Sequence, residues 1–395
     1  MPPASLVVFK KIKKSCQIMG KHCLMALAFF SMTLIYSSLA FGLDLQLLDR
    51  LNTPAKHFDH VEKTTFLGLQ RLSGRIVAVG DRGVIAYTDN SGLSWQQSDV
   101  PISTLITAVH FPEDSKGWAV GHSGSVLHSK DQGETWQLQL DGNKVNELLL
   151  NKAKDDLQTI KIESAQAGED EQQDYQYAVE DAEFALSNAE FDAELGPANP
   201  FLDVLFLNEN KGFAIGAYGL FVMTEDGGQT WKSVASRLEN FDRYHLNALA
   251  KLKGGTIIIA GEAGTLFLSN DQGDHWETLY GPYQGSFFGI QATKNKSEAL
   301  LYGLKGHVFK TKNDGQSWKR IQVDVETSLT ASSISDDGVI VIAGFSGVLL
   351  VSYDQGESFT HIKTSGFESF NGVEFSGANG LVLIGDESIQ SINVY

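Results

Sequence analysis

The chain of 395 residues has only two cysteines, Cys16 and Cys23, and both lie near its N-terminus. A fold that depends on disulfides, or thiolate chemistry beyond residue 23, is therefore excluded. Only residues 24–40 are uncharged and apolar for long enough to interact with a bilayer, which excludes a protein that crosses the membrane many times. Because 42% of the residues are hydrophobic and 20% are charged, the chain can still bury a large core, and global disorder is excluded as well.

The N-terminal segment has the composition of a signal peptide. Residues 1–23 carry five lysines and no acid, residues 24–40 are mostly apolar, and Ser38 and Ala40 are small residues at the spacing of a cleavage site. We expect residues 1–40 to be a cleaved signal peptide, and an uncleaved anchor is the alternative. Either form predicts that the rest of the chain is exported to the periplasm or an equivalent lumen.

Positive charge is scarce in this chain. It has 31 lysines and arginines against 48 aspartates and glutamates, a net charge of −17 that becomes −22 when the five lysines of residues 1–40 are removed. A surface this acidic repels nucleic-acid phosphates and anionic lipid headgroups. We therefore expect no nucleic-acid partner and no direct membrane insertion after signal cleavage.

One pattern, Ser/Thr-x-Asp/Asn-x-Gly-x-x-Trp/Phe, recurs six times and contains five of the six tryptophans. We expect its acid or amide to accept hydrogen bonds from backbone N–H groups in a turn, its glycine to supply an unusual dihedral angle, and its aromatic ring to pack between repeats. The acid or amide positions are Asn90, Asp131, Asp226, Asp271, Asn313 and Asp354, and the aromatic positions are Trp95, Trp136, Trp231, Trp276, Trp318 and Phe359.

A second signature, Gly-x-x-Gly between two β-rich runs, lies upstream of each copy and predicts a hairpin whose glycines permit a tight turn. With a preceding strand and the strand at the aromatic position, each repeat holds four strands in about 40 residues, the size of a propeller blade. An incomplete seventh copy lies at residues 381–392. The sequence therefore predicts an all-β, seven-bladed β-propeller over residues 43–395, in which residues 43–47 supply the outer strand of the last blade.

The aromatic positions of the second and third copies are 95 residues apart, whereas the other spacings are 41 to 45. The excess, residues 141–199, holds 15 acids and four lysines. Two stretches with helical spacing, the second containing Val179, Ala182, Leu186 and Ala189, flank the acidic residues 165–174. We expect an acidic helical insertion between blades 2 and 3 that partly covers or flanks the axial face and contributes to partner binding; a solvated hairpin without a partner is the alternative.

The first pattern is known as the Asp box or BNR repeat and occurs in sialidases and other propellers. With residues 117–136 as the best copy, the chain from about residue 66 to 395 resembles the photosystem II stability and assembly factor family. The resemblance implies an exported, non-enzymatic seven-bladed propeller that serves photosynthesis as a protein-binding scaffold or assembly factor, with a membrane or envelope protein as its client. A glycan-active hydrolase of sialidase type and an accessory subunit of a membrane transporter are the alternatives.

Strand parity places the Asp boxes on one rim and the Gly-x-x-Gly tips, with the links between blades, on the other. The tips differ among repeats while their frame is constant, so we expect partner binding there, unless these turns simply vary without constraint. The aromatic residues Tyr218 and Phe345 are the strongest candidates. The full set of candidate tip residues is Asp81, Arg82, His122, Tyr218, Glu262, Lys305, Phe345 and Asp386.

No motif of a metalloprotease, an α/β-hydrolase, a P-loop enzyme or a paired CxxC site occurs in the sequence. His57 and His60 offer only two possible metal ligands, and the segment at Arg75 lacks the proline of the sialidase Arg-Ile-Pro motif. We therefore expect a monomeric protein that is not an enzyme and has no catalytic residue, no cofactor and no metal.

Overall fold

The computed structural model describes residues 49–364, 369–377, 380–386 and 388–393. The chain divides into two units, Met1–Arg50 and Leu51–Tyr395, and all helices and strands given below belong to the second. The predicted signal peptide at residues 1–40 and the predicted closing strand at residues 43–47 lie outside the described residues.

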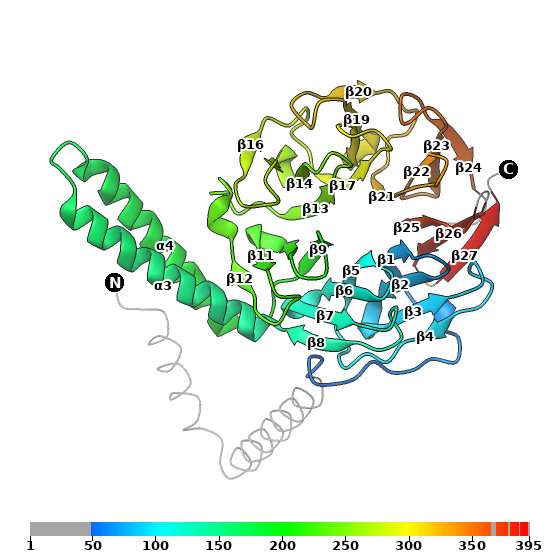
Figure 1. The fold of residues 1–395 in the computed structure, drawn as a ribbon, viewed down its shortest axis with the longest axis horizontal. Helices are drawn as coiled ribbons and strands as arrows, with labels where there is room; N and C mark the ends of the chain where they lie inside the picture. Colours follow the sequence, from blue (N-terminus) through cyan, green and yellow to red (C-terminus); the bar gives the residue numbers. More distant parts are fainter. Residues whose placement is uncertain (1–48, 365–368, 378–379, 387, 394–395) are drawn as a thin grey trace, which may run out of the picture. The chain divides into compact units, whose positions relative to one another are not determined.

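Within the described residues, 27 strands form seven antiparallel sheets, the blades, around a ring (Figure 1). Blades 1 to 3 consist of β1 (Phe66–Arg71), β2 (Ile76–Gly80), β3 (Ile85–Thr88) and β4 (Gln96–Gln97); β5 (Ile106–Glu113), β6 (Lys116–Gly121), β7 (Ser125–Ser129) and β8 (Gln137–Leu140); and β9 (Phe201–Phe206), β10 (Gly212–Gly216), β11 (Phe221–Thr224) and β12 (Lys232–Ser233). Blades 4 and 5 consist of β13 (Leu246–Lys251), β14 (Ile257–Gly261), β15 (Leu266–Ser269) and β16 (Glu277–Leu279); and β17 (Phe287–Ala292), β18 (Ala299–Gly303), β19 (Val308–Thr311) and β20 (Lys319–Ile321). Blades 6 and 7 consist of β21 (Leu329–Ile334), β22 (Ile340–Gly344), β23 (Val348–Ser352) and β24 (Thr360–Lys363); and β25 (Phe370–Phe375), β26 (Gly380–Gly385) and β27 (Ser388–Asn393).

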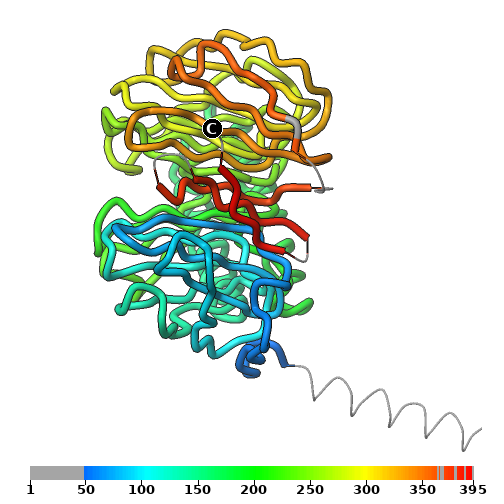
Figure 2. The backbone as a smooth tube through the Cα atoms, turned by 90° about the vertical axis from the view of Figure 1, so that its right-hand side faces the viewer, coloured from blue at the N-terminus to red at the C-terminus, as the bar shows by residue number. Residues whose placement is uncertain are grey.

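The ring closes between the last blade and the first. The first strand of each blade contacts the first strand of the next, and β25 contacts β1. The side-chain amide of Asn371 donates to the carbonyl of Phe66 (3.1 Å), and the hydroxyl of Ser391 donates to the carbonyl of Ser91 (3.4 Å). Figure 2 shows the C-terminal strands beside the first blade. The prediction of an all-β seven-bladed propeller is confirmed.

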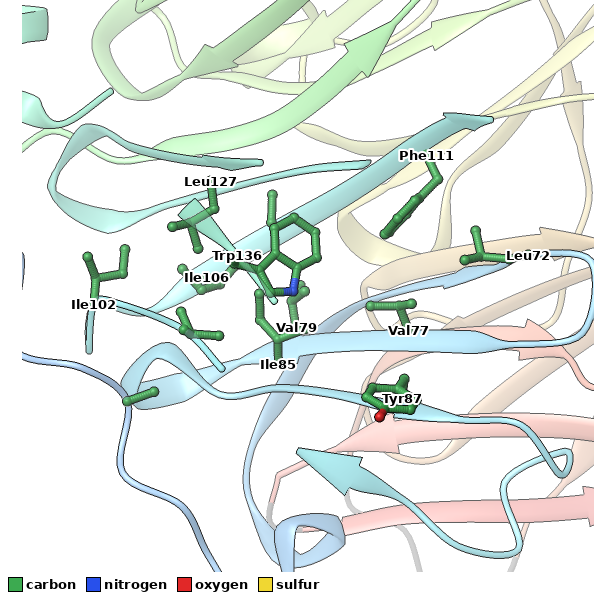
Figure 3. Packing of buried hydrophobic residues seen from close by; sticks show 13 residues of the cluster. Leu72, Val77, Val79, Ile85, Tyr87, Ile102, Ile106, Phe111, Leu127 and Trp136 are labelled. Carbon is green, nitrogen blue, oxygen red and sulfur yellow. The ribbon is translucent and has the colours of Figure 1, made fainter. Parts of the chain in front are cut away.

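The middle strands of each blade are buried on both faces, because neighbouring blades pack against both. All residues of β2 and β3 are buried, which explains their continuous apolar runs, whereas β1 and β4 are largely half-exposed. Between blades 1 and 2, Val77, Val79 and Phe111 pack with the ring of Trp136 (Figure 3). The ring of Phe111 meets that of Trp136 edge-on, with the ring centres 5.9 Å apart.

The Asp box forms the turn between the third and fourth strands of a blade. In blade 2 the hydroxyl of Ser129 accepts from the backbone N–H of Gly133 (2.9 Å), and a carboxylate oxygen of Asp131 accepts from that of Thr135 (3.0 Å). Gly133 has φ 86°, a conformation that side chains disfavour. The acid or amide accepts from the N–H four residues later in all six copies, at Asn90, Asp131, Asp226, Asp271, Asn313 and Asp354.

Each box aromatic ring packs between its own blade and the preceding one, so the box joins sheets as well as strands. The rings with these contacts are those of Trp95, Trp136, Trp231, Trp276, Trp318 and Phe359.

The Gly-x-x-Gly tips form the turns between second and third strands, on the rim opposite the boxes. Most are single 3-10 turns: η2 (Asp81–Gly83), η3 (His122–Gly124), η4 (Ala217–Gly219), η6 (Glu262–Gly264) and η7 (Leu304–Gly306). The expected role of the first glycine is wrong: Gly121 is extended, with φ −173°, and is required because a Cβ there would lie 2.1 Å from the carbonyl oxygen of Leu105. The second tip residue takes a left-handed φ of 53° to 58° in six tips.

The insertion between blades 2 and 3 is a hairpin of two helices, α3 (Gly142–Gln166) and α4 (Gln172–Leu195), which pack against each other (Figure 1). This confirms the predicted helical insertion. The carboxylate of Asp141 caps α3 by accepting from the N–H groups of Asn143 (2.9 Å) and Lys144 (3.1 Å). Short turns η1 (Val61–Lys63) and η5 (Ala235–Arg237) complete the described elements. Among the helices that the structure describes, none combines the length and apolar character needed to cross a lipid bilayer.

Candidate partner-binding surface

The predicted tip residues are spread over seven blades and do not form one cluster. All three acids of the set have partners within the propeller: Asp81 pairs with Arg82 (3.0 Å), Glu262 accepts from the N–H of His245 (3.2 Å), and Asp386 accepts from the side-chain amide of Asn371 (3.2 Å). The other tip residues, which are exposed, are His122, Tyr218, Lys305 and Phe345. Tyr218 and Phe345 are 54% and 42% exposed, so both rings are accessible to a partner.

The tip of blade 3 lies beside a groove that the sequence patterns did not reveal. The groove, about 450 Å³ in volume, runs between the helical hairpin of α3 and α4 and blade 3, and it includes the link that leads to blade 4. Three exposed aromatic rings line it: Phe184 of α4 (69% exposed), Tyr218 and Phe241 of the link (88% exposed). Phe184 and Phe241 are 57 residues apart in sequence and belong to no repeat, so only the fold brings them together.

Arg243 holds the hairpin against the propeller at this groove. Its guanidinium pairs with the carboxylate of Asp192 on α4 (3.1 Å) and donates to the carbonyl of Tyr218 (3.3 Å). The N–H of Tyr218 donates to the ring nitrogen Nδ1 of His245 (2.8 Å). At its base, the hairpin contacts η3 and β12, and the amide of Asn146 donates to the carbonyl of Gly196 (2.9 Å). The insertion therefore flanks the tip rim.

The first strands of all seven blades line an axial cavity of about 270 Å³. None of its lining residues comes from the hairpin or from the tips. No arginine or glutamate lines it either, and a sialidase-type centre would need both.

Most polar side chains of the axial cavity serve the ring itself. At four blade junctions the second residue of a first strand donates to the carbonyl of the first residue of the next blade, at 2.6 to 3.1 Å. The pairs are Thr107 with Phe201, Asn247 with Phe287, Thr330 with Phe370, and Asn371 with Phe66. This inter-blade clamp was not predicted from the sequence.

Two ionisable groups are buried at the axial cavity. Burial raises the pKa of Asp203 to about 7, although its carboxylate accepts from the N–H groups of Leu249 (2.7 Å) and Val204 (2.8 Å). Burial also raises the pKa of Tyr302, whose hydroxyl donates to Ser332 (2.9 Å), which in turn donates to the side-chain oxygen of Gln291 (2.8 Å). Asp203 thus links blade 3 to blade 4, and the bond from Tyr302 to Ser332 links blade 5 to blade 6.

The remaining residues that suggested chemistry are paired elsewhere. Arg75 stacks over the ring of Tyr87 (3.9 Å) and pairs with Asp89 (2.7 Å) and Glu134 (3.1 Å), which joins blades 1 and 2 on the box rim. Arg71, which shares a box-rim cavity of about 480 Å³ with Arg75, pairs with Asp336 (2.7 Å).

The two histidines of the link before blade 1 bind different carboxylates. His57 pairs with Asp99 (3.2 Å) and His60 with Glu62 (3.1 Å). In the part of the chain that the structure describes, no group of three or more His, Cys, Asp or Glu residues could hold a metal ion.

Comparison with known proteins identifies relatives over most of the propeller. The family model described as "Photosynthesis system II assembly factor YCF48" matches residues 77–165 and 185–339. The photosystem II assembly lipoprotein Ycf48 of Synechococcus sp. (strain CC9902) is 30% identical over 163 residues, 41% of this chain and 48% of that protein. The chloroplastic photosystem II stability/assembly factor HCF136 of Arabidopsis thaliana is 23% identical over 295 residues, 69% of this chain and 71% of the relative. The match to the first of these relatives thus spans about half of its length.

Solved structures share the fold at low sequence identity. A structure described as YCF48 bound to D1 peptide has a TM-score of 0.56 at 14% identity and covers 87% of this chain and 99% of its own. YCF48 from Cyanidioschyzon merolae has a TM-score of 0.56 at 13% identity, covering 84% and 95%. These similarities show the propeller fold. Residues 166–184, between the two segments matched by the family model, lie at the end of the hairpin that is remote from its base.

Proposed function

This chain belongs to the family of the photosynthesis system II assembly factor YCF48, and we propose that it is an exported, non-enzymatic propeller that binds a membrane or envelope protein and supports the assembly of that protein's complex. Its relatives carry the names of an assembly lipoprotein and of a chloroplastic stability and assembly factor. A YCF48 structure holds a D1 peptide, which supports a peptide segment of another protein as the ligand class. Action as a monomer stays a prediction.

The observation that carries this proposal is the set of exposed aromatic rings on the tip rim. Tyr218 and Phe241 are exposed beside the groove, and Phe345 is exposed on blade 6. Exposed aromatic side chains that gather around a concavity are typical of protein-binding surfaces. The axial polar groups and the acids and amides of the boxes, in contrast, already hydrogen-bond within the propeller, so they offer a client fewer free groups.

The test is site-specific photo-crosslinking of the full chain in its native cell envelope. A photoreactive phenylalanine analogue replaces Tyr218 or Phe345 on the tip rim, and the matched control carries it at Leu93, a residue of the box rim that is 84% exposed. We expect mass spectrometry to identify the same membrane or envelope protein from both tip positions and not from Leu93. Equal recovery from Leu93, or no membrane or envelope protein from either tip, would overturn the proposal.

A further inference from the structure

One face of α4 carries a row of large apolar side chains. Tyr177, Phe184, Phe191 and Leu195 are 56%, 69%, 60% and 60% exposed. Their spacings of seven, seven and four residues place them within about 40° of one another around the helix, in a row about 27 Å long. Single exposed apolar residues are common in soluble proteins, but four large ones on one face of a helix are typical of an interaction surface.

This row is continuous with the groove at the tip of blade 3. Phe184 belongs to both, and the opposite wall of the groove supplies Tyr218 and Phe241. We call these six residues, Tyr177, Phe184, Phe191, Leu195, Tyr218 and Phe241, the aromatic surface. It combines one helix with a fixed edge of the propeller, because Arg243 ties α4 to blade 3.

The charge around the aromatic surface is strongly negative. Residues 142–195 contain 14 acids and four lysines. Two of the lysines are already paired within the hairpin, Lys152 with Asp156 and Lys161 with Glu183. Such a field attracts a basic partner and repels both an anionic lipid surface and a second copy of the same hairpin.

We propose that the aromatic surface binds one amphipathic, lysine- or arginine-rich α-helix of the client protein, laid along α4. The backbone groups of α4 are hydrogen-bonded within the helix, so recognition has to use side chains and cannot proceed by addition of a β-strand. A row of about 27 Å corresponds to a partner helix of about 18 residues. This inference rests on the proposed function and names the segment of the client that is recognised.

The first test measures binding of designed peptides to the full chain by fluorescence anisotropy. The probe is an 18-residue helical peptide with leucines on one face and lysines on the other; the matched peptides are its scrambled sequence and a version with glutamate in place of lysine. We expect the probe to bind at least tenfold more tightly than either matched peptide. Equal binding of the scrambled peptide would overturn the need for a helical apolar face, and equal binding of the glutamate peptide would overturn the need for basic charge.

Variants then locate the site. We expect the triple substitution Phe184→Ser, Phe191→Ser, Phe241→Ser to weaken probe binding at least tenfold, whereas Tyr280→Ser, at a fully exposed ring outside the aromatic surface, changes it less than twofold. All three phenylalanines are at least 60% exposed, so the fold should persist, and circular dichroism checks this. A second variant, Glu180→Gln with Asp181→Asn, leaves all aromatic residues in place and removes two negative charges. It should weaken binding and reduce the dependence of binding on salt concentration. Unchanged binding in a folded triple variant would overturn the proposal.

The last test identifies the natural occupant. A photoreactive group at Phe184 in the native envelope should crosslink to a basic helical segment of another protein. Crosslinks to a second copy, to lipid, to residues 1–48 of the same chain or to nothing would each overturn the inference. Its failure is distinguishable from failure of the proposed function, because a client recovered from both Tyr218 and Phe345 upholds that function whatever Phe184 contacts.

Discussion

Replacement of Asp203 by asparagine should change how the stability of the propeller depends on pH. The carboxyl is buried at the axial cavity, and this burial raises its pKa to about 7, even though two backbone N–H groups donate to it. An aspartate in the unfolded chain has a pKa of about 3.9. The difference of about three units corresponds to a free energy on the order of 4 kcal/mol.

The sign follows from which state holds the proton. Below about pH 4 both the folded and the unfolded chain bind it, so the folded state carries no penalty. Between about pH 4 and pH 7 Asp203 keeps the proton in the folded chain and loses it in the unfolded chain. As the pH rises through this range, the free energy of unfolding therefore falls by about 1.4 kcal/mol per pH unit. Above the folded pKa of about 7 the loss is complete.

Buried histidines act in the opposite direction, so the wild-type curve alone does not isolate Asp203. Burial lowers the pKa of His110 and of His128 to about 4, and their contributions to stability are lost as the pH falls from about 6.5 toward 4. The difference between wild type and Asp203→Asn removes these terms, because both proteins contain the same histidines.

The assay is urea unfolding of wild type and Asp203→Asn from pH 5 to pH 8. In Asp203→Asn, an NH2 group replaces one carboxylate oxygen and faces a backbone N–H, so two donors meet. This costs about 1 to 3 kcal/mol at every pH, because asparagine does not titrate. We expect the stability of the wild type relative to the variant to fall by about 3 kcal/mol between pH 5 and pH 8. Asp337→Asn, at an exposed aspartate, is the control that tests whether the effect is specific to the buried carboxyl. A constant difference for Asp203→Asn would refute the reasoning.

Three further substitutions test what holds the blades together, each read as a change in the free energy of unfolding. Trp136→Ala should cost about 3 to 5 kcal/mol, because it empties the seam between blades 1 and 2; a cost below 1 kcal/mol would contradict this. Gly121→Ala should destabilise, because its Cβ would meet a backbone carbonyl, whereas Gly168→Ala, with open space around it, should be neutral; equal effects would contradict the steric argument. Lys310→Ala should cost about 3 kcal/mol or more, because Lys310 is 3% exposed and pairs with two glutamates. The control is Lys312→Ala, which removes an exposed pair to one of the same glutamates and should cost less than about 1 kcal/mol. Equal losses would contradict the role of burial.

The blade count was predictable because its signals are local and repeated. The Asp box and the Gly-x-x-Gly tip each occupy a few consecutive residues, and the repeats need only be counted. The first glycine of the tip was misjudged for a physical reason: Gly121 is required by a carbonyl of the neighbouring strand, and that contact is not visible in the turn itself. The inter-blade clamp was missed because Thr107 or Asn247 is informative only once the next blade is in place.

The candidate surface was only half predictable. Tyr218 lies within a repeat and could be singled out as an aromatic tip residue, whereas Phe241 lies in a polar link without a pattern. The spacing of Tyr177, Phe184 and Phe191 was present in the sequence, but this helix has two apolar faces. The face that indicated the helix is the other one, which contains the buried Ala189. Which face stays exposed depends on how α3 packs, and this is tertiary information.

The exposed row on α4 has a consequence for the strength and salt dependence of binding. Burial of its four side chains offers about 2 kcal/mol each, or about 8 kcal/mol in total. Association itself costs at least about 4 kcal/mol, so apolar contact along α4 alone gives at best a dissociation constant of about 1 mM. Micromolar binding, near −8 kcal/mol, therefore needs further contributions, which the rings of Tyr218 and Phe241 and the negative charge of the hairpin can supply. Association can cost as much as about 15 kcal/mol, so the six apolar side chains, at about 2 kcal/mol each, do not secure micromolar binding by themselves. We therefore expect the acidity of the hairpin to contribute to affinity as well as to the choice of partner.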